Sequence, residues 1–384
     1  MLKENIANKL RDEINSEFTY FFKLKGTKLA NNVWNQICAM MDRIEQTIRH
    51  INLLDLYLRD HSSLAYGFLD VLNNVSNLVE YIRIIHIYFP TKKYDELCRS
   101  NEIFKQVGKS GLGNDILYLK YLRSLSAPHA LNTSKFSDLY QNTQEYCPLV
   151  LWDNKKLEDG RTTNIVFHVY QDDGSSSKKI YIHTNQIYAI AEKMVQSLTY
   201  VFEEIHIKAE EYYTRLSSIK LKRIDEFDSI SAYIDYICFE YSNRLSNNYE
   251  EIFEYYSNLF TYDFSQLSSL INVEKYKEAV LKSILEFADY LETLNEKKES
   301  FYFTDLYIPY PNGEKLSGYG YNLQKVSHLI DNTHHDGTLA RYLITEMRDF
   351  FDQYLNIDEA MNDFELFTIV STALYLYKCE IEGK

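Results

Sequence analysis

Arg123 and His129 lie six positions apart in the segment Leu-Arg-Ser-Leu-Ser-Ala-Pro-His, and together they could do chemistry on a phosphodiester. An arginine guanidinium presents a planar fork of hydrogen-bond donors that can clamp a phosphate. A histidine can move a proton near neutral pH. In RNA, the histidine would deprotonate a 2′-hydroxyl or protonate the leaving oxygen, while the arginine stabilises the charge that develops at phosphorus. The pair therefore predicts metal-independent cleavage of RNA.

Whether these two side chains meet depends on Pro128. Residues six apart on an ideal helix point about 240° apart, so Arg123 and His129 would not share a face of one helix. Proline disfavours helical geometry at the preceding residue, so the helix should end or kink and let His129 fold back toward Arg123. At a helix C-terminus the dipole favours the protonated imidazole, whereas a new helix beginning at Pro128 disfavours it. The sequence leaves both arrangements open.

An arginine, a polar residue and then a histidine at the end of a late helix in a small bundle resembles the HEPN superfamily (higher eukaryotes and prokaryotes nucleotide-binding). Arg123, Ser124 and His129 carry this resemblance, with Asn132 and Thr133 as supporting residues, and it would cover residues 1–150. It implies a metal-independent endoribonuclease of a toxin–antitoxin or phage-defence system, with RNA as substrate and a homodimer that builds one active cleft. Some HEPN proteins are inactive scaffolds.

The same stretch also looks like a segment of uncharacterised Firmicutes proteins, in which the order Ala-His-Pro is expected. Here the order is Ala127-Pro128-His129, so the placement of the histidine departs from that pattern. The competing interpretation of the segment is an ordinary helix terminus with Arg123 in a surface ion pair.

Two other pairs of arginine and histidine have a similar spacing. Arg43 and His50 fall within an uninterrupted helical pattern, and Arg161 and His168 fall on a predicted strand. Only Arg123 has its histidine beyond a predicted helix end, so that pair is the preferred candidate.

Two further motifs could suggest a metal or a nucleotide. The sequence His-His-Asp at 334–336 offers adjacent ligands, which rarely share one ion, and no third ligand lies at a useful spacing. The sequence Gly-Tyr-Gly-Tyr at 318–321 lacks the strand-to-helix context of a phosphate-binding loop. Both are interpreted as loops, and we predict no metal and no cofactor.

Apolar residues recur at helical spacing through the first third of the chain. The pattern predicts a four-helix bundle with helices at 2–22, 33–58, 66–88 and 114–126.

Composition changes after residue 145. Residues 147–152, 163–170 and 179–183 are β-like, and the sequence Asp-Asp-Gly-Ser at 172–175 predicts the turn of a hairpin. Thr184 can cap the helix that follows, and its apolar stripe continues to Leu216.

The last part of the chain is helical apart from one aromatic, irregular stretch at 301–321. We predict helices at 226–245, 247–260, 273–298, 322–332, 338–355 and 357–381. The predicted fold class is mainly α: a four-helix bundle, a β-hairpin insertion, a long connecting helix and a helical C-terminal region. The predicted domains are 1–150, 151–220 and 221–384.

Composition fits a globular protein: of 384 residues, 45% are hydrophobic and 25% are charged, while 5 prolines and 12 glycines favour long uninterrupted elements. Five well-separated cysteines indicate a reducing compartment. With neither an apolar leader nor an apolar span, we expect a cytoplasmic protein without a membrane role.

The net charge of −14 is unevenly distributed. Residues 1–130 hold 17 Lys and Arg against 14 Asp and Glu, and the remainder holds 24 against 41. An acidic chain argues against indiscriminate nucleic-acid binding, but the basic first part leaves room for a local phosphate-binding surface. The second hypothesis is a non-catalytic interaction protein, whose acidic C-terminal half binds a protein partner.

Overall fold

The structure, a computed structural model, describes most of the chain. The described residues are 2–24, 32–54, 61–126, 136, 139–140, 144–158, 160–171, 177–245, 249–267, 269–294, 303–308, 316, 318–330, 337–358 and 360–383.

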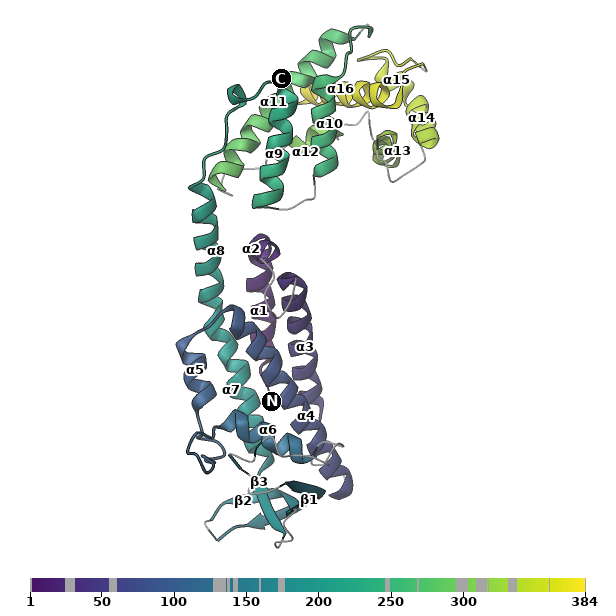
Figure 1. The fold of residues 1–384 in the computed structure, drawn as a ribbon. Helices are drawn as coiled ribbons and strands as arrows, with labels where there is room; N and C mark the ends of the chain where they lie inside the picture. Colours follow the sequence, from purple (N-terminus) through teal and green to yellow (C-terminus); the bar gives the residue numbers. More distant parts are fainter. Residues whose placement is uncertain are drawn as a thin grey trace. The chain divides into compact units, whose positions relative to one another are not determined.

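Two compact units make up the chain, unit 1 with residues 1–210 and unit 2 with residues 211–384. The fold is mainly helical with one small antiparallel sheet, which confirms the predicted fold class (Figure 1). The predicted boundary at 150/151 falls inside a strand, Glu145–Lys156, because the sheet and the preceding helices share one unit. The division at 210/211 lies ten residues before the predicted boundary at 220/221.

Helices form the first part of unit 1. In the described residues they are α1 (Glu4–Ser16), α2 (Phe18–Lys23), α3 (Val33–Leu53), α4 (His61–Tyr88), α5 (Lys92–Arg99) and α6 (Asp115–Ser126). Helix α3 shows why they pack: its buried residues follow one stripe, from Val33 through Ile37 and Met41 to Ile51. That stripe lies between α1 and α4.

Helix α5 was not predicted, because it is short and buries only Tyr94 fully. Its start is fixed locally, since the side chain of Thr91 accepts a hydrogen bond from the backbone N–H of Tyr94.

The sheet consists of β1 (Glu145–Lys156), β2 (Thr162–Gln171) and β3 (Lys178–Ile182), in that order and antiparallel. Ile165, Phe167 and Val169 are fully buried on one face of β2, and the Phe167 ring lies 6.2 Å from the ring of Phe68 on α4. The predicted hairpin is therefore confirmed as the pair β2–β3, and its predicted turn at 172–175 lies outside the described residues.

The long helix predicted after the sheet is two helices, α7 (Thr184–Ser197) and α8 (Val201–Ser217), joined by one 3₁₀ turn, η2 (Leu198–Tyr200). The hydroxyl of Ser197 donates to the carbonyl of Met194, and the hydroxyl of Thr199 donates to that of Gln196. Such back-bonding competes with the regular helix ladder, which explains the interruption. Helix α7 runs beside α4 and completes a helical bundle with α1 and α3 (Figure 1).

The predicted cap Thr184 is wrong: His183 caps α7, because its Nδ1 accepts a hydrogen bond from the N–H of Asn185. Thr184 is bound instead by Asn164 of β2, which contacts both its hydroxyl and its N–H. The contact with Asn164 therefore replaces the predicted local capping role of Thr184.

Unit 2 is helical throughout its described residues. Its elements are the end of α8, η3 (Ile224–Glu226), α9 (Ile230–Arg244), α10 (Glu250–Thr261), α11 (Leu270–Thr293), α12 (Phe303–Tyr307), α13 (Gly320–Val326), η5 (Ser327–Leu329), α14 (Gly337–Glu346), α15 (Arg348–Phe351) and α16 (Asp363–Glu382). The predicted helix at 338–355 is interrupted at Met347, and the one at 357–381 begins only at Asp363, where Asn362 and Glu365 form a capping box.

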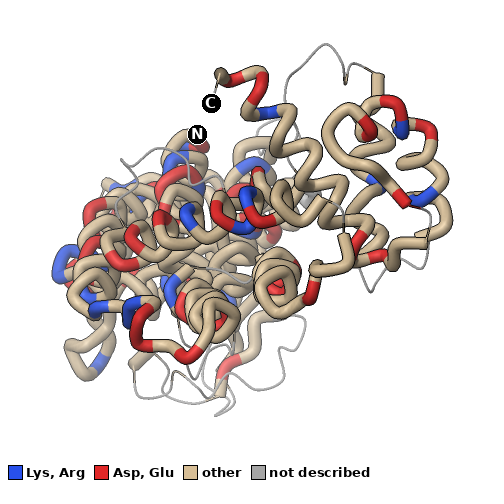
Figure 2. The backbone as a smooth tube through the Cα atoms, turned by 90° about the horizontal axis from the view of Figure 1, so that it is seen from above, with Lys and Arg blue, Asp and Glu red and all other residues tan. Residues whose placement is uncertain are grey.

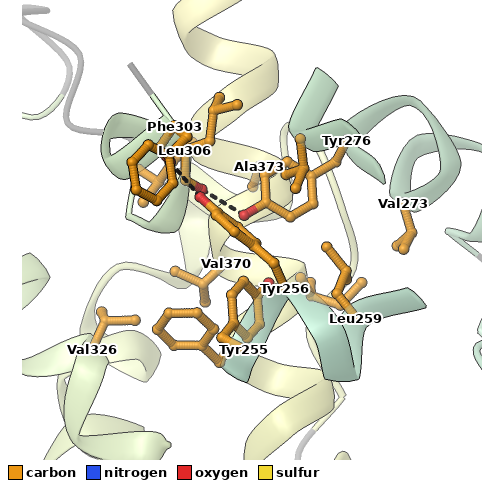
Figure 3. Close-up of a cluster of buried hydrophobic side chains, with 14 of the residues drawn as sticks. Tyr255, Tyr256, Leu259, Val273, Tyr276, Phe303, Leu306, Val326, Val370 and Ala373 are labelled. Carbon is orange, nitrogen blue, oxygen red and sulfur yellow. Dashed lines mark hydrogen bonds between the residues drawn. The ribbon is translucent and has the colours of Figure 1, made fainter. Parts of the chain in front are cut away.

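Hydroxyl groups hold the short helix α12 in the core of unit 2 (Figure 3). The Tyr256 hydroxyl donates to the carbonyl of Phe303, and the Tyr276 hydroxyl donates to that of Leu306, both at 2.5 Å. Ser371 donates to the carbonyl of Tyr307. A five-residue helix leaves most of its carbonyls without intrahelical partners, and these donors from α10, α11 and α16 bind three carbonyls of α12.

A buried guanidinium closes two other helix ends in unit 2. Arg244, only 2% exposed, donates to the carbonyls of Leu216, Ile219 and Leu291 at 3.0–3.1 Å and bonds to Glu240. The carbonyls of Leu216 and Leu291 belong to the last turns of α8 and α11, and Ile219 follows the end of α8, so the cation also complements the helix dipoles.

Candidate functional site

Helix α6, which carries the predicted Arg123, is fixed at its beginning by two acceptors. The side chain of Asn114 accepts from the N–H of Leu117 at 2.9 Å. The carboxylate of Asp115 accepts from the N–H groups of Ile103 and Phe104 at 3.1 and 2.8 Å. Acidic and amide side chains suit the N-terminus of a helix, where N–H groups lack partners. The preceding loop therefore determines where α6 starts.

The second half of α6 is attached to the sheet through Glu145, whose side chain is fully buried at the start of β1. The Tyr121 hydroxyl donates to Glu145 Oε2 at 2.7 Å, and the Lys178 ammonium of β3 contacts Glu145 Oε1. Burial, reinforced by the bond to Glu145, raises the pKa of Tyr121 well above its ordinary value, so the phenol stays a neutral donor. This pairing compensates the desolvation of the carboxylate.

Arg123 lies in the last turn of α6 and is half-buried. Its guanidinium forms no hydrogen bond or ion pair with any residue that the structure describes. The Ser126 hydroxyl donates to the backbone carbonyl of Arg123 at 2.9 Å, and the Ser124 hydroxyl donates to that of Tyr121 at 2.7 Å. Among the described residues the guanidinium therefore has no partner and lies near a helix C-terminus. The hydroxyl of Ser124, in contrast, hydrogen-bonds to a carbonyl of the same helix.

Two further cations accompany Arg123. Lys120 lies one turn earlier on the same face of α6, and its ammonium is 2.6 Å from Glu80 of α4. Arg83 contacts the other oxygen of Glu80 at 2.9 Å. Burial opposes ionisation of Glu80, but the hydrogen bonds from Lys120 and Arg83 outweigh it and lower the pKa of the carboxyl. One carboxylate, that of Glu80, therefore pairs with two cations. With Arg123, which lies one turn from Lys120 on α6, cations outnumber anions, and this excess of positive charge suits an anionic ligand.

His86 is the described histidine that lies deepest in unit 1, and it is not suited to proton transfer with a substrate. Its Nε2 lies 3.1 Å from the Ser197 hydroxyl, and its ring stacks on Tyr94 with centroids 3.6 Å apart. Burial lowers the pKa of His86 to about 4, so the ring stays neutral. His86 is therefore a packed histidine of the core.

Of the predicted site residues, Arg123 and Ser124 are described, whereas His129, Asn132 and Thr133 lie outside the described residues, as does the motif at 334–336. In the pair Arg43 and His50, the histidine belongs to a surface ion pair: His50 contacts Asp70 at 3.0 Å, between α3 and α4. In the described ranges no group of three or more His, Cys, Asp or Glu could hold a metal ion.

Sequence reasoning missed the charged residues on α6 and in contact with it. Lys120 had a usable signal, because a basic residue three positions earlier shares the helix face of Arg123. Glu80, Glu145 and Lys178 had none, since their partners lie 24 to 40 positions away in the chain.

The comparisons with known proteins add no relative. No family model, no curated protein and no solved structure matches the chain. Across the described helices, none is long and apolar enough to cross a membrane.

Proposed function

We propose that this protein is a metal-independent endoribonuclease of the HEPN type, in which Arg123 binds the scissile phosphate and His129 transfers a proton. The observation that carries the proposal is the position of Arg123: it ends a helix packed on a helical bundle, and its guanidinium has no partner among the described residues. A cytoplasmic location and a role in a toxin or phage-defence system belong to the same proposal, as does a homodimer in which two protomers complete one cleft.

The chemistry needs one guanidinium and two proton transfers. The 2′-oxygen of a ribose forms a bond to phosphorus while the bond from phosphorus to the 5′-oxygen breaks. The 2′-hydroxyl loses its proton to a base and the 5′-oxygen gains one from an acid, and His129 serves one of these transfers. Arg123 stabilises the extra negative charge on the phosphoryl oxygens in the transition state. The products are a 2′,3′-cyclic phosphate and a 5′-hydroxyl.

The electrostatics around Arg123 support an anionic substrate. Lys120 and Arg83 share the single carboxylate of Glu80, so the exposed side of α6 has more cations than anions. Lysine and arginine side chains that neutralise phosphates provide sequence-independent affinity for RNA, which salt weakens.

The test is cleavage of RNA by the purified chain in EDTA. We expect Arg123→Ala and His129→Ala each to lower the cleavage rate at least about 100-fold, the usual range for a lost transition-state donor or proton-transfer group. Arg99→Ala is the matched control, because Arg99 is an exposed arginine in the last turn of α5. Cleavage that survives both substitutions would exclude this site.

A second candidate function, non-catalytic binding of a basic protein partner, is favoured by the charge of unit 2. Residues 211–384 hold 16 Lys and Arg against 30 Asp and Glu, a net charge of −14. A partner captured by unit 2 in low salt and released in high salt, together with no nuclease activity, would support this alternative.

A further inference from the structure

A large open groove in unit 2 lies between α11 and α16. It has a volume of about 1070 Å³, and its floor includes the small residues Ala279 and Ser283 of α11, with Leu306 and Leu376 beside them. Small side chains allow another backbone to approach a helix closely. The groove belongs to unit 2 alone and is remote in sequence from the proposed ribonuclease site.

Four charges of alternating sign line the α11 side of this groove. Lys275, Glu278, Lys282 and Glu286 recur every three or four residues, so they share one face of the helix. All four are exposed, and none forms an ion pair or a hydrogen bond within the described part of the chain. Glu278 and Lys282 have the spacing of an intrahelical pair, yet the structure does not join them.

The order of these charges along α11 is complementary to the same order in a second, antiparallel copy of the helix. If a second α11 lies antiparallel to the first, with the two-fold axis passing near residues 280 and 281, Lys275 faces Glu286 of the second copy. The same rotation sets Glu278 against Lys282 of the second copy. Because the axis repeats each contact, the stripe forms four ion pairs without a like-charge contact.

Apolar side chains flank the stripe on the same face. Ile271 is 76% exposed and Leu285 is 37% exposed, so both leave apolar surface in water in a single chain. In the antiparallel pair they come within reach of the groove of the other copy, where the apolar floor can cover them.

We propose that two copies of this chain associate through their α11 helices, antiparallel and around a two-fold axis, with the groove between α11 and α16 as the receiving surface. This interface is separate from the homodimer of the ribonuclease proposal, because it uses residues of unit 2 only and forms without RNA.

The test exchanges charges within the stripe and measures the mass of the full chain in solution by light scattering and sedimentation. The variant K275E/K282E makes the stripe wholly acidic, and E278K/E286K makes it wholly basic. Each variant alone should dissociate at least about 100-fold more readily than the parent dimer, because every cross-axis contact becomes a contact between like charges. An equimolar mixture of the two should restore a two-chain species that contains one copy of each.

The control E251K/E254K makes the same change in net charge as E278K/E286K, on exposed residues of α10, and should leave this association intact. The circular dichroism spectrum of the folded protein should be unchanged in all three variants, since the substituted side chains are exposed in a single chain and lie outside its core. A monomeric parent chain, or charge-reversed variants that keep the mass of the parent in solution, would overturn the proposal. So would a mixture that fails to re-form the two-chain species.

Discussion

The two units differ in charge far more than in secondary structure. Unit 1 holds 25 Lys and Arg against 25 Asp and Glu and is neutral, whereas unit 2 carries the entire net charge of −14. Basic and acidic residues are interspersed along the described backbone (Figure 2). A neutral unit with a local group of cations can accept a phosphate, while an acidic unit repels one. The charge difference therefore agrees with the two proposals, which assign RNA chemistry to unit 1 and protein contacts to unit 2.

The units also differ in how they satisfy buried polar groups. Unit 1 buries a carboxylate, Glu145, against Lys178 and Tyr121. Unit 2 buries the guanidinium of Arg244. In the same unit, uncharged hydroxyls such as that of Tyr256 donate to buried backbone carbonyls. Removing one partner from a buried charged group leaves the other without compensation, so each unit has its own most sensitive position.

The largest effect on stability is expected from Arg244→Ala. The change leaves the buried carbonyl of Leu291, two partly buried carbonyls and Glu240 without their donor, which should lower the free energy of unfolding of unit 2 by roughly 3–5 kcal/mol. Both tryptophans, Trp34 and Trp152, lie in unit 1, so tryptophan fluorescence reports that unit while circular dichroism reports both. In urea, the dichroism transition should shift and the fluorescence transition should not. Equal shifts of both signals would mean that the two units unfold together.

A smaller effect, in the opposite unit, is expected from Glu145→Gln. The amide can still accept from Tyr121 but loses the charge that pairs with Lys178, and Lys178 is exposed enough to regain water. We expect unit 1 to lose about 2 kcal/mol of unfolding free energy, seen as an earlier fluorescence transition in urea. Lys179→Met, at the exposed neighbouring position of β3, is the control and should change little. A loss confined to the dichroism signal would contradict the assignment of this network to unit 1.

The smallest effect is a pH dependence of unit 1 through His206. Hydrogen bonds to Glu13 and then to Glu17, at 2.6 and 3.1 Å, raise the pKa of His206, which is half-exposed on α8. A folded-state pKa above the unfolded value of about 6.5 gives stability that is complete below that pH and is lost as the pH rises through the folded pKa. Melting followed by tryptophan fluorescence should therefore show a small drop in Tm from pH 6 to pH 8. His206→Gln should remove that drop, and an unchanged pH dependence in this variant would refute the assignment.

Local patterns account for the predictions that the structure confirms. The buried stripe of α3 and the β-like run of β2 follow from side chains a few residues apart, and both lie where the patterns place them. Predictions from local patterns were wrong where a residue distant in the sequence made the contact, or where side-chain hydroxyls hydrogen-bonded to carbonyls of the preceding helical turn. Asn164 binds Thr184 from β2 and leaves the cap to His183, and Thr199 contributes to the break between α7 and α8.

Only part of the candidate site could be predicted from local patterns in the sequence. Arg123 was identified from its motif, and its position at a helix end was predicted from Pro128. Its unpaired state among the described residues, and the shared carboxylate of Glu80, could not be predicted, because they depend on which face of α4 lies against α6.

The amino-acid sequence by itself determined the helical class, the β-hairpin, the uneven charge and the Arg123 motif, because periodicity, turn residues and composition act over a few positions. Only the tertiary structure decided that Lys178 meets Glu145 and that Arg244 reaches Leu291, across separations of 33 and 47 residues. It also decided that the charges of α11 border a groove rather than open solvent. These outcomes depend on how helices pack, and packing is a property of the assembled surfaces rather than of any one segment.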